Sequence, residues 1–371
     1  MAFCVDILSY YRKRNLEQGI KSDWGKIKNG KGRRDADTSK CVKPNRAGCD
    51  GICRRDFIAL LHHERPNYEI RALVRSSQQA CTLASHFPKV HCILAPPEPH
   101  GLLVDEGEAA DVVVQIANSD DEPMSLALLA GVAKHVGGAY LHISGTATLI
   151  DPSFPLGELD SRVYSDAAQA AEILCLPRDR LHAAVEQKII ETAEELHARV
   201  AIVSLPVMYG RGRGPTAPHS KFFEPYIRAV LSHGKAFVIG RGQNAMSNAH
   251  VSDASSALLL LVDEALKGES SNASWGKDGY YFVETCESSF MEDAKVTAEL
   301  LEKRGVIRST GIDSLDRDSA TQFWSFGPVL WGSNARCRAE RLAALVWQRS
   351  HISRKESLEE MIDYIFDSEQ G

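Results

Sequence analysis

The stretch GCDGICRRD, residues 48–56, carries the residue types of a turn that binds phosphate. Gly48 and Gly51 would let backbone N–H groups approach a pyrophosphate, and a helix starting there would add the positive end of its dipole. Arg54 stands where such a turn has its third glycine, which permits close packing of helix on strand. Its long side chain must turn to solvent or push the helix outward. The alternative is that the two glycines only form a loop.

A second candidate for anion binding is the stretch PVMYGRGRGP, residues 206–215. Arg211 and Arg213 alternate with glycines there, and the guanidinium fork suits an anionic substrate or a diphosphate. The alternative is that the glycines supply turn conformations and the arginines are solvated.

The bulk composition indicates an ordinary soluble protein. Of 371 residues, 44% are hydrophobic and 25% are charged, which suffices for a large core. No apolar run reaches the roughly 18 residues of a membrane-spanning helix, and the first residues do not resemble a secretion signal. Nine cysteines, an odd number scattered along the chain, favour reduced thiols. We therefore expect a cytoplasmic protein with no membrane partner and no metal site.

The first part of the chain differs from the rest in charge. Residues 1–50 hold 12 Lys and Arg against 6 Asp and Glu, whereas the remainder is acidic. Because this stretch is polar and aperiodic, we expect residues 1–47 to be a disordered tail, and a nucleic-acid partner is unlikely on this composition. A mistranslated or alternatively spliced start would give the same pattern.

From residue 48 onward, helical patterns alternate with short strands that are apolar on both faces. This alternation predicts an α/β fold with a doubly wound parallel sheet covered by helices on both sides. We expect strands at 68–76, 89–95, 111–118, 139–146 and 199–210, and helices at 57–64, 78–87, 102–110, 125–136 and 180–198.

The expected first strand is the exception. Residues 39–48, SKCVKPNRAG, contain basic residues and a proline in place of an apolar run, so this strand is predicted to be missing or degraded. The sequence then divides into a tail at 1–47, a dinucleotide-binding domain at 48–215, and a smaller substrate lobe at 216–371 that is interleaved with the first.

Six landmarks in this order resemble the extended short-chain dehydrogenase/reductases, in particular the NAD-dependent epimerase/dehydratase-like proteins common in fungi. The resemblance covers about residues 48–345. It implies a Rossmann-like NAD(P)-binding oxidoreductase or epimerase/dehydratase-like protein that acts on a small carbonyl or sugar-like substrate. The alternative is a non-catalytic NAD(P)-binding sensor or interaction protein that kept the fold. The landmarks are GCDGICRRD, YEIRALVRS, ADVVVQIANSDD, AYLHISGT, SLPVMYGRGRGP and SNAHVSDAS.

The resemblance also implies a catalytic set. Such proteins place a Ser or Thr after the fifth strand, which Ser144 and Thr146 satisfy, and a Tyr four residues before a Lys on the next helix. Lys188 fits the lysine, but Ala184 occupies the position of the tyrosine. The usual catalytic tyrosine is therefore absent from this position.

His182 is the nearest substitute for the tyrosine, because an imidazole titrates near neutrality and could act as a general acid. It precedes Lys188 by six residues, which is about 240° around a helix, so the two share a face poorly. Glu186 follows His182 by one turn, so His182 is alternatively an ordinary helix residue paired with it. Tyr164 is a further candidate whose position the sequence does not place.

The resemblance also implies the cofactor contacts. Arg75 ends the second strand, where an arginine suits the 2′-phosphate of NADP and an acidic residue would suit NAD. NADP is therefore the expected cofactor, with NAD possible. Ala117 after the fourth strand, with Pro206 and Tyr209 after the sixth, complete the expected contacts. The stretch LAPPEP lacks the Gly-Asp pair that often follows the third strand.

Overall fold

The computed structural model describes residues 2–6, 51–215, 220 and 222–370, and its central feature is a seven-stranded sheet. The strand order is β11-β7-β5-β4-β1-β2-β3, and every neighbouring pair is parallel. All residues of β4 and almost all of β5 are buried, as the apolar runs predicted. The predicted doubly wound α/β fold is confirmed. The seven strands are β1 (Ala2–Asp6), β2 (Glu69–Val74), β3 (Val90–Leu94), β4 (Val112–Gln115), β5 (Ala139–Gly145), β7 (Arg199–Leu205) and β11 (Tyr280–Phe282).

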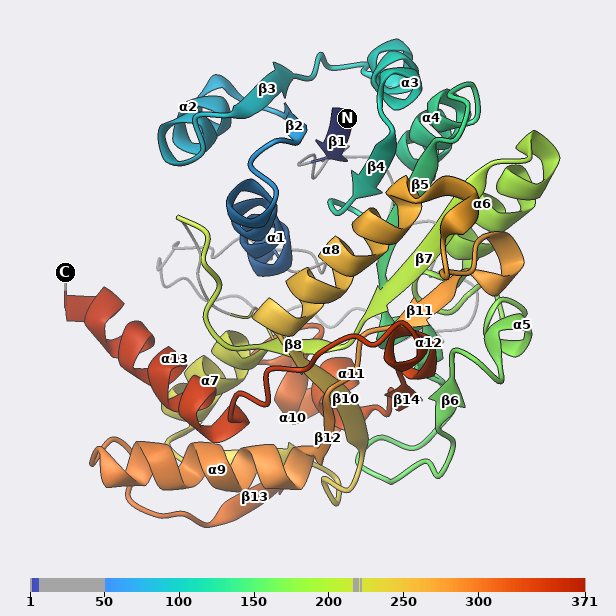
Figure 1. Cartoon of the computed structure of the whole chain (residues 1–371). Coiled ribbons are helices and arrows are strands. Elements are labelled where there is room, and N and C mark those ends of the chain that lie inside the picture. Colours follow the sequence, from blue (N-terminus) through green and yellow to red (C-terminus); the bar gives the residue numbers. More distant parts are fainter. Residues whose placement is uncertain (1, 7–50, 216–219, 221, 371) are drawn as a thin grey trace, which may run out of the picture.

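Helices cover both faces of this sheet (Figure 1). On one face α1 (Gly51–Glu64) packs against α8 (Val251–Leu266). On the other face α3 (His100–Ala109), α4 (Glu122–Val132) and α6 (Ala183–Leu196) follow one another. Strands β4 and β5 are thus sandwiched between helices, which explains why their side chains are apolar on both faces.

The expectation that the first strand is missing is wrong. Residues 2–6 form β1, which pairs with β2 on one side and with β4 on the other. This is the central position that a doubly wound sheet gives to its first strand. The strand is separated from α1 by residues 7–50, so it does not lie next to the glycine turn in sequence. The rest of the expected tail lies outside the described residues.

A second hydrophobic core lies in the lower part of Figure 1. Tyr226, Phe237 and Trp331 meet in its centre with ring centroids 5.4–5.7 Å apart. Helix α8 and β11 come from the same half of the sequence but pack in the larger core, so the two parts of the chain are interleaved. The elements of this half that are not yet named are α7 (Phe223–His233), β9 (Ala236–Ile239), β10 (Ala245–His250), β12 (Cys286–Ser289), α9 (Phe290–Lys303), β13 (Ile312–Leu315), α10 (Arg317–Thr321), α11 (Gly327–Gly332), β14 (Cys337–Arg338), α12 (Glu340–Ala344) and α13 (Arg354–Gln370). The first half also contains α2 (Ser77–His86), β6 (Tyr164–Ser165), α5 (Ala170–Ile173) and β8 (Val207–Tyr209).

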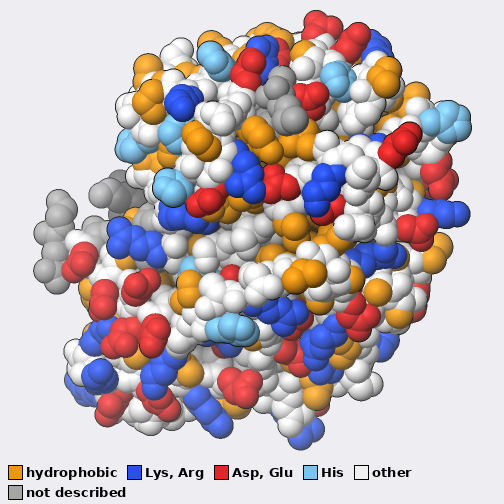
Figure 2. Space-filling model, viewed as in Figure 1, with side chains coloured by type: hydrophobic (Ala, Val, Ile, Leu, Met, Phe, Trp, Pro, Cys, Tyr) orange, Lys and Arg blue, Asp and Glu red, His pale blue; other side chains and the backbone are white. Residues whose placement is uncertain are grey.

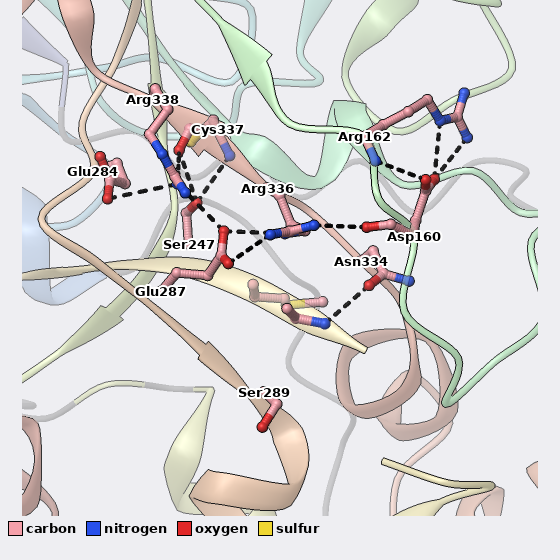
Figure 3. A network of polar contacts seen from close by, with 12 residues as sticks. Asp160, Arg162, Ser247, Glu284, Glu287, Ser289, Asn334, Arg336, Cys337 and Arg338 are labelled. Atoms are coloured by element: carbon pink, nitrogen blue, oxygen red, sulfur yellow. Dashed lines mark hydrogen bonds and ion pairs between the residues drawn. The ribbon is translucent and has the colours of Figure 1, made fainter. Parts of the chain in front are cut away.

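An ion-pair network ties β14 into the fold (Figure 3). Arg336 donates two hydrogen bonds to Glu287 at 2.9 and 3.1 Å, and a third to the carbonyl of Asp160 at 2.9 Å. Arg338 donates to the same carboxylate at 3.3 Å. These bonds join three segments that are distant in sequence, namely the segment around Asp160, β12 and β14.

The described residues contain no helix that is both long and apolar enough to span a bilayer. Figure 2 shows acidic and basic side chains mixed over the visible face, without a large area of one sign.

Candidate active site

The residues that could do chemistry gather at the carboxyl ends of β4 and β5. Between β4 and β1 the direction of the strand order reverses, and the crevice outside such a switch point is where doubly wound sheets bind ligands. Ser119 and Asp120 follow β4, Ser144 and Gly145 end β5, and His182 starts α6.

His182 points its ring into this place. Its Nδ1 lies 2.7 Å from Asp120 Oδ1 and 3.2 Å from Ser119 Oγ, and 12% of its side chain is exposed. Its Nε2 lies over Gly145, where a side chain would approach it to 3.2 Å. Among the described residues Nε2 has no hydrogen-bond partner, so it can take a ligand. His182 holds a left-handed backbone conformation, φ 67°, a strained conformation that clusters at functional sites.

His182 and Asp120 each stabilise the charged form of the other side chain. Burial alone lowers the pKa of His182, but its hydrogen bond to Asp120 and the charge of that carboxylate outweigh burial and raise the pKa above its ordinary value. Burial likewise raises the pKa of Asp120, yet the bond from His182 outweighs this and lowers it. The hydrogen bond and the charge interaction thus favour the imidazolium of His182 and the carboxylate of Asp120, and in the imidazolium Nε2 carries a proton that it can donate.

A second set of side chains, which is buried, surrounds Glu186 one turn along α6. Ser144 donates a hydrogen bond to Glu186 Oε1, and the hydroxyl of Tyr280 donates to Oε2 at 3.2 Å. Ser144 is 0% exposed and Glu186 only 1%. Burial raises the pKa of Glu186 to about 7, against the lowering effect of these bonds and of the charge of His182.

The predicted lysine does not join this set. Lys188 follows Glu186 by two residues, about 200° around the helix, so it faces away from Ser144. The four-residue spacing expected of a Tyr–Lys pair is occupied by His182 and Glu186 instead.

Thr146 and Tyr164 lie apart from the hydrogen bonds just described. Thr146 starts the short helical turn Thr146–Leu149 after β5, two residues beyond Ser144, and is 4% exposed. Tyr164 is buried in β6, which pairs with β14.

The expected cofactor residues are distributed as follows. Gly51 is the first residue of α1, Arg75 follows β2 directly, and Ala117 is 4% exposed after β4, so all three lie at the carboxyl edge of the sheet. The backbone N–H of Arg75 donates to Gln79 Oε1 at 3.0 Å at the start of α2. Gly48 lies outside the described residues.

Pro206 and Tyr209 lie toward the smaller lobe. Pro206 is buried between β7 and β8. The hydroxyl of Tyr209 donates to the carbonyl of Ile352 at 3.1 Å, and its ring meets His250 edge-on at 5.4 Å. The side chain of Tyr209 thus contacts the C-terminal segment and is not directed at Ser144.

The glycine-rich loop after β8 packs on the first turns of α1. Side chains at Gly212 and Gly214 would come within 2.8 Å of Ile52 and 2.3 Å of Arg55, so only glycine fits there. Arg213 donates to buried Asp56 from its backbone at 2.7 Å and from its guanidinium at 2.6 and 2.9 Å. The arginine is thereby committed to a protein carboxylate.

The described part of the crevice fits a dinucleotide. The start of α1 lies at the carboxyl edge, where the positive end of a helix dipole favours an anionic group, and Ala117 adds only a methyl group beside β4. The three nearest atoms that a side chain at Gly51 would meet all belong to the flexible guanidinium of Arg55, at 3.1–3.7 Å.

Residues 179–274 match the NAD dependent epimerase/dehydratase family, and this range includes both His182 and Glu186. This part of the chain is similar to the NAD-dependent epimerase/dehydratase proteins. The predicted resemblance is thereby confirmed. Among curated proteins, "Oxidase ucsJ" of Acremonium sp is 29% identical over 316 residues, which cover 81% of this chain and 91% of that protein.

Three solved structures with the same fold are bacterial enzymes that act on sugar nucleotides. The dTDP-glucose 4,6-dehydratase DesIV of Streptomyces venezuelae, with NAD and TYD bound, superposes with a TM-score of 0.61 at 14% identity, covering 99% of this chain and 97% of that one. The dTDP-glucose 4,6-dehydratase of Bacillus anthracis, in complex with NAD, gives 0.60 at 14% identity, covering 100% and 98%. The UDP-glucose 4-epimerase of Thermotoga maritima, with UDP-glucose, gives 0.58 at 12% identity, covering 85% and 96%. At these identities the likeness concerns the fold.

Sequence reasoning missed Asp120 and passed over Glu186 as a surface partner of His182. The spacing of Glu186 from His182 was the available signal, because it equals that of the expected Tyr–Lys pair. For Asp120 only the position after the fourth strand pointed to the site.

Proposed function

We propose that the chain is an NAD(P)-dependent oxidoreductase or epimerase-like enzyme that acts on a small carbonyl or sugar-like substrate. The observation that carries this proposal is the His182–Asp120 pair, whose free Nε2 lies over the end of β5 at the switch point of the sheet. A protonated imidazole at this position can donate a proton to a carbonyl oxygen or take one from a hydroxyl.

The cofactor would supply hydride transfer, which no side chain of the chain can perform. The start of α1 and Gly51 would hold its diphosphate, and Ala117 would leave room along β4. Arg75 favours NADP over NAD, because its guanidinium can contact a 2′-phosphate by two charge-assisted bonds. His182 would take the role of the absent tyrosine, with Asp120 holding its ring and its charge.

The first test is binding. Nicotinamide fluorescence is titrated with the purified full chain, using NADPH and NADH in parallel. The second test is turnover, in which the nicotinamide absorbance is followed with NADPH and a panel of small aldehydes and ketones, and with NADP+ and a panel of UDP-sugars and dTDP-sugars. We expect saturable binding of nucleotide, and a change in nicotinamide absorbance with at least one substrate class. If neither NADPH nor NADH binds, the proposal is wrong.

A further inference from the structure

The second group of the site is Glu186, which takes the helix position of the expected lysine with the opposite charge. It follows His182 by one turn of α6, so the two side chains project toward the same side. Both of its oxygens are engaged, one by Ser144 and one by Tyr280. No Lys or Arg side chain of the described residues pairs with it. Burial makes an ionised carboxyl costly, and His182 is the cationic side chain that faces this one, so near neutrality Glu186 exchanges a proton readily.

We propose that Glu186 is a positioning residue of the active site, which sets the donor direction of Ser144 and the charge state of His182. This inference rests on the proposed function, since it concerns the same site. As a carboxylate, Glu186 accepts the hydroxyl proton of Ser144. As a carboxylic acid it can donate to Ser144 Oγ, which then turns its own proton toward another acceptor. Because Glu186 is only 1% exposed, it acts through Ser144 and His182 and not by contact with the substrate.

Few other charged groups face Glu186. From α6 it is faced by His182, from the end of β4 by Asp120, and from β11 by Tyr280, whose pKa burial raises well above its ordinary value. His142 on β5 stays neutral, because burial lowers its pKa to about 3. The proton that is exchanged between about pH 5 and 8 therefore belongs to Glu186 or His182, and the two titrations are coupled.

The sign of the effect on stability follows from the raised pKa of Glu186. Below the ordinary value of 4.5 both the folded and the unfolded chain hold this proton. Between there and about 7 the unfolded chain loses it and the folded chain keeps it, so the free energy of unfolding falls as pH rises. Above about 7 the loss is complete and the penalty stays constant.

The test uses Glu186→Gln, which keeps the shape but cannot ionise. Its amide oxygen can accept from Ser144, and its NH2 group can donate to the hydroxyl oxygen of Tyr280. The matched control is Glu194→Gln, an exposed residue of the same helix. In histidine-labelled protein, the His182 signal is assigned by its loss in His182→Gln and then titrated by NMR. We expect Glu186→Gln to lower the pKa of His182 by roughly half a unit or more, the size of a partly buried charge interaction, and Glu194→Gln to leave it unchanged.

The same proteins are unfolded by urea at several pH values. We expect the decline in stability between about pH 4.5 and 7 to be smaller in Glu186→Gln than in the control. Ser144→Ala serves as a second variant, and it should shift the transition of Glu186 to higher pH because the lowering bond is lost. If the His182 titration and the stability profile of Glu186→Gln equal those of the control, the inference is wrong. Failure of the unsubstituted chain to bind NADPH or NADH would instead overturn the proposed function, since these two readouts need no nucleotide.

Discussion

Asp56 on α1 and Arg213 in the loop after β8 form a paired contact between segments 157 residues apart. The carboxylate is 1% exposed and accepts three hydrogen bonds, whereas 43% of the guanidinium side chain reaches solvent. Burial raises the pKa of Asp56, but the hydrogen bonds from Arg213 and its charge outweigh burial and lower the pKa. The pair thus fixes the glycine-rich loop against the first turns of α1, where the diphosphate is proposed to bind.

We expect Asp56→Ala to lower the free energy of unfolding by about 1–3 kcal/mol, since Arg213 can turn to water but its backbone N–H loses its acceptor. The measurement is urea unfolding at neutral pH. The control is Glu224→Gln, which removes the exposed ion pair with Arg228 and should change stability by less than about 0.5 kcal/mol. Equal losses of stability in the two variants would show that the buried contact stabilises the fold no more than an exposed ion pair does.

The stabilisation by Asp56 should also depend on pH. Since its folded pKa lies below the ordinary value of 3.8, the contribution is present above about pH 4 and is lost as pH falls through the folded pKa. Acid titration of the unsubstituted chain should therefore show a loss of stability that is smaller in Asp56→Ala. Parallel acid curves would refute this assignment.

The role of His182 is tested by His182→Gln. We expect turnover of NADPH to fall by roughly 10²–10⁴-fold, the usual contribution of a general acid, while NADPH affinity changes little. In the unsubstituted chain the rate should decline as pH rises above the raised pKa of His182, because the imidazole then lacks the proton it donates. His197→Gln is the matched control, because His197 lies at the opposite end of the same helix and is also in a left-handed conformation, φ 53°. A loss of activity common to both variants would argue against a catalytic role for His182.

Cofactor choice is tested at Arg75. NADPH should bind more tightly than NADH, and Arg75→Ala should abolish the difference by weakening NADPH binding only. Lys89→Ala, which removes a cation before β3, should keep the preference. Equal affinities for the two nucleotides in the unsubstituted chain would contradict this prediction.

The sequence predicted most of the sheet because β4 and β5 are buried on both faces and therefore continuously apolar. It failed at β1 because the short run AFCVD stands far from the glycine turn, and adjacency to that turn is what identifies a first strand. At the site, the four-residue spacing indicated the correct helix positions, whereas the expected residue types indicated the wrong ones. Lys188 has the expected chemistry but faces away, whereas Glu186 has the expected spacing and an unexpected charge.

The position of β1 predicts the outcome of a cut in the segment that follows it. A site-specific protease sequence is inserted after Gly30, and the protein is cleaved under native conditions. We expect the N-terminal fragment to stay bound, because residues 2–6 pair with strands on both sides. Native mass spectrometry would detect both fragments in one complex. Release of the fragment with the rest of the fold intact would contradict the assignment of β1.

The last prediction concerns the connection between β1 and α1. Strand β1 ends at Asp6 in the central position of the sheet and α1 begins at Gly51, so both belong to one strand–turn–helix unit whose connection is normally two to six residues. Deleting residues 7–47 joins Asp6 to Gly48 and leaves the glycine turn directly after the strand. Loop closure costs about 0.6 kcal/mol for each doubling of length, so this shortening should stabilise the fold by about 2 kcal/mol. A turn anchored at both ends also needs less ordering when a nucleotide binds, and we expect NADPH affinity to rise at least roughly tenfold, about 1.4 kcal/mol. The control deletes residues 2–47 and so removes β1 as well, which should prevent folding. Unchanged NADPH affinity in the joined chain, measured by fluorescence titration, would show that residues 7–47 do not impair the turn.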